Sequence, residues 1–207
     1  REGEKVDVAL VDSVVSAMQN INMIYLNGGR IPTRIGNRYE STYPYDSFRT
    51  SDGDVIIGAG NDKLYATLCD EMGMPELKED PRFLTVSDRV KNHAALKELI
   101  ETWTMRSTID EVADRLNKVG VPSTPINTID RIVKDPQIAG ARKMFPSIRQ
   151  PGIGDVPTTN NALKFTNHPA DPEVPAPSLG QDNDTIFHTY ANLSPEQIEL
   201  LREKKII

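Results

Sequence analysis

The sequence is poor in the residues that support disulfide or metal chemistry. It has a single cysteine, Cys69, and three histidines among 207 residues. One thiol cannot form a disulfide within the chain, which fits a reducing compartment and predicts a cytoplasmic protein. His93, His168 and His188 lie far apart in the sequence and lack cysteine or carboxylate partners at the spacing of metal ligands, so no metal site is expected.

A surplus of basic residues and a long apolar run are also missing. The 24 lysines and arginines are outnumbered by 30 aspartates and glutamates, which gives a net charge of −6. Non-specific nucleic-acid binders carry a basic surplus, so a nucleic-acid partner is not expected. The most apolar stretch, residues 14–26, is interrupted by polar side chains and is too short to span a bilayer. The charged residues 1–5 form no signal peptide, so neither export nor a membrane partner is expected.

Motifs of covalent and phosphate-binding enzymes are absent as well. No Gly-x-Ser-x-Gly segment indicates a hydrolase, and neither of the common glycine-rich phosphate loops is present. Cys69 lies on the apolar face of an expected helix, where a free cysteine behaves as a small hydrophobic residue. The chain also begins without methionine, which predicts either processing or a piece of a longer protein.

The first part of the chain is expected to form a strand, a helix and a loop. Residues 6–10 have the short apolar alternation of a strand that enters a core. From residue 11 to residue 25, apolar residues recur every three or four positions, which predicts one amphipathic helix. This helix should end at Asn27-Gly28-Gly29, because glycine accepts the left-handed conformation of a helix cap. Residues 27–45 then form a long polar loop, and connections of this length are usually functional or are linkers.

The next segment, from residue 46 to about residue 120, has the pattern of a compact module with a hairpin and helices. Asp52-Gly53 lies between two segments, residues 46–50 and 55–59, and predicts a hairpin between them. Apolar stripes and a Thr-x-x-Glu capping box predict the helices, which should span residues 62–72, 92–105 and 108–120.

After residue 120 proline becomes frequent, and the expected elements are short or extended. They are an extended segment bracketed by Pro122 and Pro125, a short helix over residues 128–134, two strands within residues 148–157, a stretched segment over residues 167–180, a helix around His188 and a last helix that starts at Ser194-Pro195-Glu196-Gln197.

The long loop contains the best candidates for ligand binding. It combines glycines with basic and amide side chains, namely Gly28, Gly29, Arg30, Arg34, Gly36, Asn37 and Arg38. Glycine lets a backbone approach a ligand closely, and arginine binds phosphate through paired hydrogen bonds. Composition leaves two interpretations open: an anion-binding loop, or a solvated linker whose arginines pair with the acidic surplus.

Short motifs follow one another in a recognisable order along nearly the whole chain. They are Gly3-Glu4-Lys5-Val6-Asp7-Val8-Ala9-Leu10, Arg34-Ile35-Gly36-Asn37, Tyr43-Pro44-Tyr45-Asp46-Ser47-Phe48, Asp52-Gly53, Ala59-Gly60-Asn61-Asp62, Asp80-Pro81-Arg82-Phe83 with Arg89 and Asn92, Gly120-Val121-Pro122, Asp135-Pro136-Gln137, Ala176-Pro177-Ser178-Leu179-Gly180 and Leu193-Ser194-Pro195-Glu196-Gln197-Ile198. Read together, they resemble the family III CoA-transferases, the family of carnitine CoA-transferase and formyl-CoA transferase.

The resemblance implies an α/β fold in which this chain is the C-terminal part of an interlocked-dimer CoA-transferase. Residues 1–45 would belong to a Rossmann-like large domain as a strand, a long helix and a linker. Residues 46–125 would form a small α+β domain. Residues 126–207 would form a return segment and C-terminal helices that pack on the large domain. The implied protein partner is a missing N-terminal half or a second protomer of a homodimer.

The resemblance also implies transfer of CoA between an acyl-CoA and a small carboxylic acid through an aspartyl-CoA intermediate. The family's catalytic aspartate lies upstream of the segment that matches residues 6–10, so no catalytic residue is expected in this chain. Coenzyme A would be a substrate rather than a permanently bound cofactor.

The family resemblance also suggests which residues contact CoA. In formyl-CoA transferase a glycine-rich loop from this region covers the active site. The residues expected to bind CoA here are those of the matching stretch, Gly28, Gly29, Arg34, Gly36, Asn37 and Arg38. The chain lacks an uninterrupted glycine run, so its loop is expected to move less or to cover a different acyl group.

Two other functions remain open at this point. A non-catalytic CoA-binding or interaction module would account for the absent nucleophile. A 2-methylacyl-CoA racemase belongs to the same superfamily but carries a glutamate at the position of Asn61, and an amide cannot replace a carboxylate in a proton relay. Asn61 therefore favours the transferase, and it also suits the cap of the helix over residues 62–72.

Overall fold

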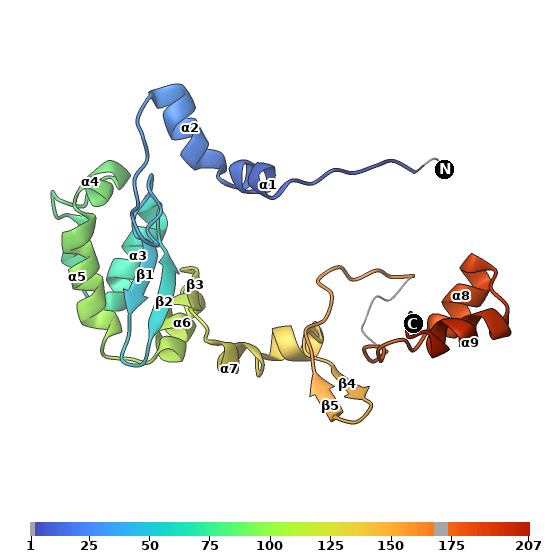
Figure 1. Ribbon diagram of the computed structural model, residues 1–207. Coiled ribbons are helices and arrows are strands. Elements are labelled where there is room, and N and C mark those ends of the chain that lie inside the picture. Colours follow the sequence, from blue (N-terminus) through green and yellow to red (C-terminus); the bar gives the residue numbers. More distant parts are fainter. Residues whose placement is uncertain (1–2, 168–173) are drawn as a thin grey trace. The chain divides into compact units, whose positions relative to one another are not determined.

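The computed structural model describes residues 3–167 and 174–207, and the chain divides into two compact units, Arg1–Ile126 and Asn127–Ile207 (Figure 1). The first unit contains α1 (Leu10–Ala17), α2 (Gln19–Gly28), β1 (Tyr45–Arg49), β2 (Asp54–Gly58), α3 (Asp62–Met72), η1 (Pro75–Lys78), α4 (Val86–Lys91), α5 (His93–Thr104), α6 (Ile109–Lys118) and β3 (Ser123–Pro125). The second unit contains α7 (Ile129–Ile132), η2 (Pro136–Ala141), β4 (Ser147–Gln150), β5 (Gly154–Pro157), α8 (Asn183–Ala191) and α9 (Pro195–Glu203).

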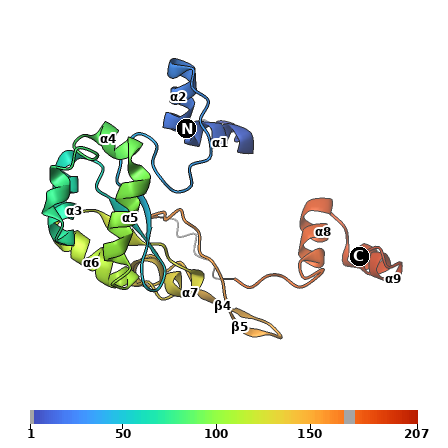
Figure 2. The same cartoon turned by 90° about the vertical axis from the view of Figure 1, so that its left-hand side faces the viewer.

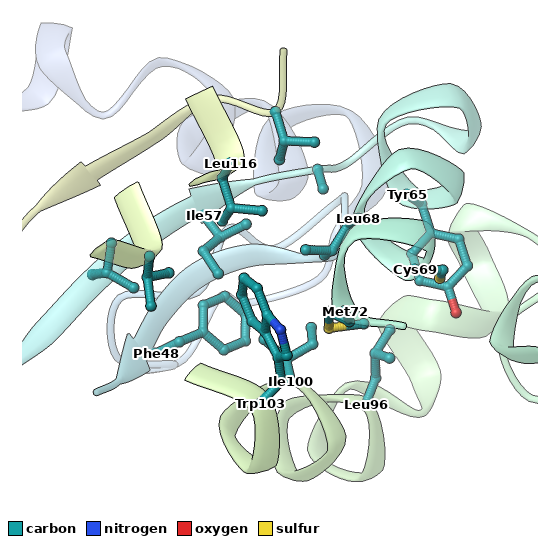
Figure 3. Close-up of a cluster of buried hydrophobic side chains, with 14 of the residues drawn as sticks. Phe48, Ile57, Tyr65, Leu68, Cys69, Met72, Leu96, Ile100, Trp103 and Leu116 are labelled. Carbon is teal, nitrogen blue, oxygen red and sulfur yellow. The ribbon is translucent and has the colours of Figure 1, made fainter. Parts of the chain in front are cut away.

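The core of the first unit lies between an antiparallel sheet, in the order β1-β2-β3, and the helices α3, α5 and α6 (Figure 2). In Figure 3 the side chains of Phe48, Ile57, Leu68, Ile100 and Leu116 gather between these layers. All of them are fully buried. The hairpin and the helices expected between residues 46 and 120 are therefore confirmed, and the extended segment after residue 120 pairs with β2 as a third strand.

The predicted strand over residues 6–10 is wrong. Residues 3–9 form no regular element, and Leu10 is the first residue of α1. Val6 is 80% exposed and Val8 is 73% exposed, so the apolar alternation enters no core within the described residues. A strand needs a neighbour to satisfy its backbone, and the described part of the chain places none beside this segment.

The prediction of one long helix from residue 11 is also wrong, because the helix breaks between α1 and α2. Gln19 has a φ of 25°, in the left-handed region. In a continuous α-helix the carbonyl oxygen of Val15 would accept the N–H of Gln19. The side chain of Asn22 donates to that carbonyl oxygen instead, at 2.7 Å. Asparagine side chains compete with the helix backbone in this way. The predicted end of the helix is confirmed by Gly29, which caps α2 with a φ of 67°.

Capping boxes define the starts of the best-formed helices. The boxes predicted at Thr108 and Ser194 are confirmed, since each side chain accepts the third helical N–H and the third helical side chain accepts the cap N–H. A third box, from Thr85 to Asp88, opens α4, which the sequence reading missed because an aspartate stands where glutamate or glutamine is more common.

The second unit confirms the short elements expected in the proline-rich part of the chain. β4 and β5 pair as a hairpin with Ile148 opposite Val156. The helix expected over residues 128–134 is α7, and the helix around His188 is α8. Arg202 of α9 pairs with Asp184 of α8 at 2.5 Å, which joins the last two helices. Residues 168–173, which include His168 and part of the stretched segment, lie outside the described residues.

Arg89 is the largest of the fully buried side chains in the described residues, and its guanidinium connects separate segments of the first unit. Its Nε donates to the carbonyl oxygen of Tyr43 at 3.0 Å, and its Nη1 donates to that of Phe83 at 3.0 Å. Its Nη2 pairs with the carboxylate of Asp62 at 2.6 Å, and the guanidinium lies 4.4 Å from the centroid of the Tyr65 ring. A buried charge is tolerated only with such partners, so Arg89 fixes the approach to β1 and the start of α3 together.

Within the described residues the structure has no helix with both the length and the apolar character that crossing a membrane requires.

Replacing the buried guanidinium with an apolar chain should destabilise the first unit. Arg89→Met leaves the carbonyl oxygens of Tyr43 and Phe83 without their donors, and each such loss costs roughly 1–3 kcal/mol, so we expect a loss of about 3 kcal/mol. Urea unfolding measures the change. Arg106→Met, at an exposed position just after α5, is the matched control and should stay within about 0.5 kcal/mol of the wild type. Equal losses in the two variants would contradict this role.

Candidate functional site

The candidate loop joins α2 to β1 (Figure 1), and two of its glycines occupy backbone conformations that favour glycine. Gly28 is the last residue of α2, and Gly29 follows it in the left-handed conformation. Gly36 has a φ of 73° and opens a turn with Asn37. L-residues with side chains adopt these values only at a cost in strain, so glycine is favoured at Gly29 and Gly36. The predicted site residues thus divide into Gly28 and Gly29 at the start of the loop and the group from Arg34 to Arg38 further along.

Asn37 and Tyr39 attach the loop to the outer face of the sheet. Asn37 Nδ2 donates to Ser47 Oγ at 3.1 Å, and the N–H of Tyr39 donates to the carbonyl oxygen of Tyr45 at 2.8 Å. The ring centroids of Tyr39 and Tyr45 lie 5.6 Å apart. Side chains alternate along a strand, so Tyr45 and Ser47 lie on the face opposite the core residue Phe48. Of the loop residues that were predicted to bind a ligand, Asn37 therefore contacts the exposed face of the sheet.

The loop arginines differ in how they are paired. Arg30 pairs with Glu40 at 2.5 Å, which closes the loop on itself. Arg34 is exposed and Arg38 is half-buried, and neither has an ion-pair partner among the residues that the structure describes. The interpretation as a linker with paired arginines therefore fits Arg30 alone. Arg34 and Arg38 present positive charge that an anion can reach.

Below the loop, the hydroxyl of Tyr43 is buried and has no hydrogen-bond partner among the described residues. Burial raises the pKa of this hydroxyl, and the negative charges of Asp46 and Glu101 raise it further, while Arg38 acts in the opposite direction. The phenol therefore stays protonated at neutral pH. Arg38 directly precedes Tyr39, whose N–H donates to the carbonyl oxygen of Tyr45, so the backbone of Arg38 lies near the start of β1.

A network of charges holds β1 against α5 below the attachment point of the loop. Lys97 of α5 lies 3.1 Å from the carboxylate of Asp46 and donates to the carbonyl oxygen of Ser47. Arg49 binds Glu101 through Nη2 at 2.7 Å. Burial raises the pKa of Glu101, but the hydrogen bonds from Arg49 outweigh it and hold the pKa below its usual range. Lys97 therefore fixes the backbone of Ser47 from the helix side, while the side chain of Ser47 accepts from Asn37 on the other face.

The outer sheet face carries site features that the sequence reading did not single out. A groove of about 360 Å³ lies there, lined by residues of the three strands and of α6, among them Tyr45, Ile56 and Thr124. Tyr39, Tyr45 and Ser47 were not among the predicted binding residues. The period-two pattern of residues 45–49 would have placed Tyr45 and Ser47 on one exposed face. Nothing local in the sequence links Tyr39 to them.

Neither covalent nor metal chemistry finds support elsewhere in the described part of the chain. Cys69 is fully buried, and burial raises the pKa of its thiol, so it remains a protonated core residue, in agreement with the sequence reading. The described residues contain no group of three or more His, Cys, Asp or Glu side chains that could hold a metal ion.

Comparison with known proteins identifies the family. The sequence model of CoA-transferase family III matches residues 1–183. The chain belongs to this family. It is 30% identical over 207 residues, 100% of this chain and 51% of the relative, to the succinyl-CoA–D-citramalate CoA-transferase of Chloroflexus aurantiacus. It is 31% identical over 191 residues, 92% of this chain and 48% of the relative, to the acetyl-CoA:oxalate CoA-transferase of Acetobacter aceti.

A solved structure supports the same assignment. The crystal structure of a CAIB/BAIF family protein from Brucella suis superposes with a TM-score of 0.71 at 35% identity, over 89% of this chain and 47% of that one. The mixed helix-and-strand fold class is thereby confirmed, and the chain belongs to an enzyme family. The chain spans about half the length of the curated relatives it matches, and it corresponds to their C-terminal portion.

Asn61 has the structural role that its position suggested. Its side chain accepts a hydrogen bond from the N–H of Leu64 at 2.9 Å and so caps α3. Asparagine is among the best N-cap residues, so helix capping accounts for this side chain without a role in proton transfer.

The charge network predicts a pH dependence of stability. The pKa of Glu101 is lower in the folded chain, so its charged form contributes stability above the unfolded pKa of about 4.3, and this contribution is lost as the pH falls through the folded value. Glu101→Gln should cost about 1 kcal/mol at pH 7, and the difference from the wild type should shrink below pH 4. Urea unfolding from pH 7 to pH 3 measures it. Glu98→Gln, on the exposed side of α5, is the matched control and should stay within about 0.5 kcal/mol of the wild type at pH 7.

Proposed function

We propose that this chain is the C-terminal portion of a CoA-transferase that moves CoA from an acyl-CoA thioester to a carboxylic acid. The observation that carries the proposal is the family match over residues 1–183, together with relatives that are named as CoA-transferases. The unpaired Arg34 and Arg38 on a loop with glycines support it, because CoA is a polyanion with phosphate groups.

The proposed reaction proceeds through an aspartate in the segment that precedes this chain in its relatives. The aspartate carboxylate attacks the thioester carbonyl, which forms a mixed anhydride and releases the CoA thiolate. The thiolate attacks the aspartyl carbonyl, which gives an aspartyl-CoA thioester and frees the first acid as a carboxylate. The acceptor carboxylate then attacks this thioester, which forms a second mixed anhydride and again releases the CoA thiolate. The thiolate attacks the acceptor carbonyl of this anhydride, which gives the new acyl-CoA and restores the aspartate carboxylate. Each step exchanges one nucleophile for another, so no net proton and no oxidant is required.

In this scheme the residues of this chain bind CoA and exclude water. Arg34 and Arg38 neutralise phosphate charge, and Gly28, Gly29 and Gly36 let the loop backbone approach the substrate closely. Asn37 is an amide that both anchors the loop to Ser47 and borders the same site. An anhydride hydrolyses readily in water, so a covering loop protects the intermediate.

We propose that residues 1–45 belong to a large domain, that residues 46–125 form the small domain and that residues 126–207 return to the large domain of an interlocked homodimer. The exposed apolar surface of α1 and α2 supports the first assignment. Neither helix has a buried residue. Even their apolar side chains are exposed: Val11 is 67% exposed and Val14 is 61% exposed. Short helices without packing are marginal in water, so this surface needs a partner.

We also propose a cytoplasmic location, which the free, buried thiol of Cys69 fits.

The relatives suggest an acceptor class for the test. The names of three of them include the dicarboxylic acids D-citramalate, oxalate and glutarate. We therefore propose that the acceptor of this enzyme is also a small dicarboxylic acid.

The direct test is a CoA-exchange assay. It uses the full-length enzyme, which contains this chain as its C-terminal portion and is as long as the relatives. Succinyl-CoA or acetyl-CoA is incubated with each dicarboxylic acid and with a monocarboxylic acid, and new acyl-CoA is detected by mass spectrometry. We expect a new dicarboxylyl-CoA in stoichiometric exchange, and enzyme inactivation when hydroxylamine traps the activated aspartate. Binding of CoA without exchange would favour the binding module, and deuterium uptake at the α-carbon of a 2-methylacyl-CoA would favour the racemase. Either result overturns the proposal.

The loop arginines provide a second test. Arg34→Gln and Arg38→Gln should each raise the KM for acyl-CoA about fivefold to tenfold, since a lost charged hydrogen bond costs roughly 1 kcal/mol or more, and should leave kcat within about twofold. The KM of the wild type should rise with ionic strength, and this slope should be smaller in the variants. Arg106→Gln removes the same charge from a site outside the loop and should leave KM unchanged. A KM that is equal in all three variants would exclude the loop from CoA binding.

A further inference from the structure

Tyr39, a residue of the candidate loop, contacts two other parts of the first unit, α2 and β1. Its hydroxyl accepts a hydrogen bond from Asn20 Nδ2 of α2. Its backbone N–H donates to the carbonyl oxygen of Tyr45 at the start of β1, and its ring lies beside the ring of Tyr45. Within the first unit, this side chain therefore joins α2, the candidate loop and the sheet.

Packing alone does not fix the Tyr39 ring. The residue is 37% exposed, and it borders a cavity of about 280 Å³ that also contacts Asn20, Glu40 and the junction between α1 and α2. A ring beside empty space loses part of its van der Waals contacts, so its orientation depends on the polar contacts at its two ends. α2 has no buried residue that could hold it in place instead. The hydrogen bond between Asn20 and Tyr39 is thus a main connection between α2 and the rest of the first unit.

The position of Tyr39 in the chain links its contacts with Asn20 and Tyr45 to the proposed CoA site. Arg38 precedes it directly, and Asn37 is already held by Ser47 Oγ. We propose that Tyr39 is a positioning residue for CoA binding: by joining Asn20 of α2 to Tyr45 of β1, it sets the position from which Arg38 meets the phosphate groups. This inference rests on the proposed function. This loop differs from a run of glycines, because Asn37 and Tyr39 hold it to α2 and β1 before substrate arrives.

The structural part of the proposal is tested by hydrogen–deuterium exchange on the full-length enzyme. Tyr39→Phe keeps the ring and the backbone bond but removes the hydroxyl that accepts from Asn20. We expect amide exchange in α2 and in residues 30–42 to become about threefold to tenfold faster, the effect of losing one hydrogen bond. Asn20→Ala should have the same effect, and the double variant should be no worse than either single variant. Asn20→Asp should keep the protection of the amides near that of the wild type, since the phenol of Tyr39 can donate to a carboxylate.

Tyr25→Phe is the matched control, because Tyr25 lies on α2, is 55% exposed and has no hydrogen bond through its hydroxyl within the described residues. It should not change the exchange. Unchanged amide exchange in Tyr39→Phe, or additive effects of Tyr39→Phe and Asn20→Ala, would contradict the claim that the hydrogen bond between Asn20 and Tyr39 holds α2 and the loop.

The functional part is tested by steady-state kinetics with the same variants. If Tyr39 positions the loop for binding, Tyr39→Phe should raise the KM for acyl-CoA about threefold to tenfold with kcat within about twofold, and Asn20→Asp should remain near the wild type. Faster exchange with an unchanged KM would overturn the role in CoA binding. If the wild-type enzyme transfers no CoA, the proposed function fails, and the exchange measurements still decide whether Tyr39 holds α2 and the loop.

Discussion

The alternation of side chains along β1 is the constraint on which the rest of the site depends. Phe48 points into the core, where it packs with the helices, and Ser47 and Tyr45 lie on the opposite face, where the loop attaches. The strand cannot shift by one residue without burying Ser47 and exposing Phe48. The energy that fixes the core register therefore also fixes the attachment points of the loop. The stability of the core and the placement of the candidate loop therefore depend on the same five residues, Tyr45–Arg49.

Local signals in the sequence were sufficient for the part of the fold whose stability is local. The Asp52-Gly53 turn, the capping box at Thr108 and the apolar stripe of α5 each specify an element within a dozen residues, and each element forms as expected. The predicted strand at residues 6–10 failed because a strand depends on a neighbour, which no local pattern supplies. The helix break at Gln19 was missed because the competing donor, Asn22, lies outside the periodicity that predicts a helix.

The candidate site shows the same division. The glycines and arginines of the loop could be read from composition, since their chemistry is independent of where the chain goes. Whether those arginines were free was not predictable, because Arg30 is neutralised by Glu40 ten positions away while Arg34 has no such partner among the described residues. Tyr39 was also beyond prediction, since its partners lie nineteen residues before it and six after it and become neighbours only through the fold.

A loop that is already held has a different energetic balance from a loop that closes on its substrate. A flexible glycine-rich loop loses conformational entropy at the moment of binding, and this loss of roughly 1–2 kcal/mol per ordered residue weakens binding. In this chain the contacts at Ser47, Tyr45 and Asn20 order the loop during folding, so less entropy would remain to be lost if a ligand bound there. The same contacts restrict how far the loop can open for substrate entry. If the transferase function holds, the residues that fasten the loop therefore set a balance between substrate affinity and product release, and they do so without touching the reacting atoms.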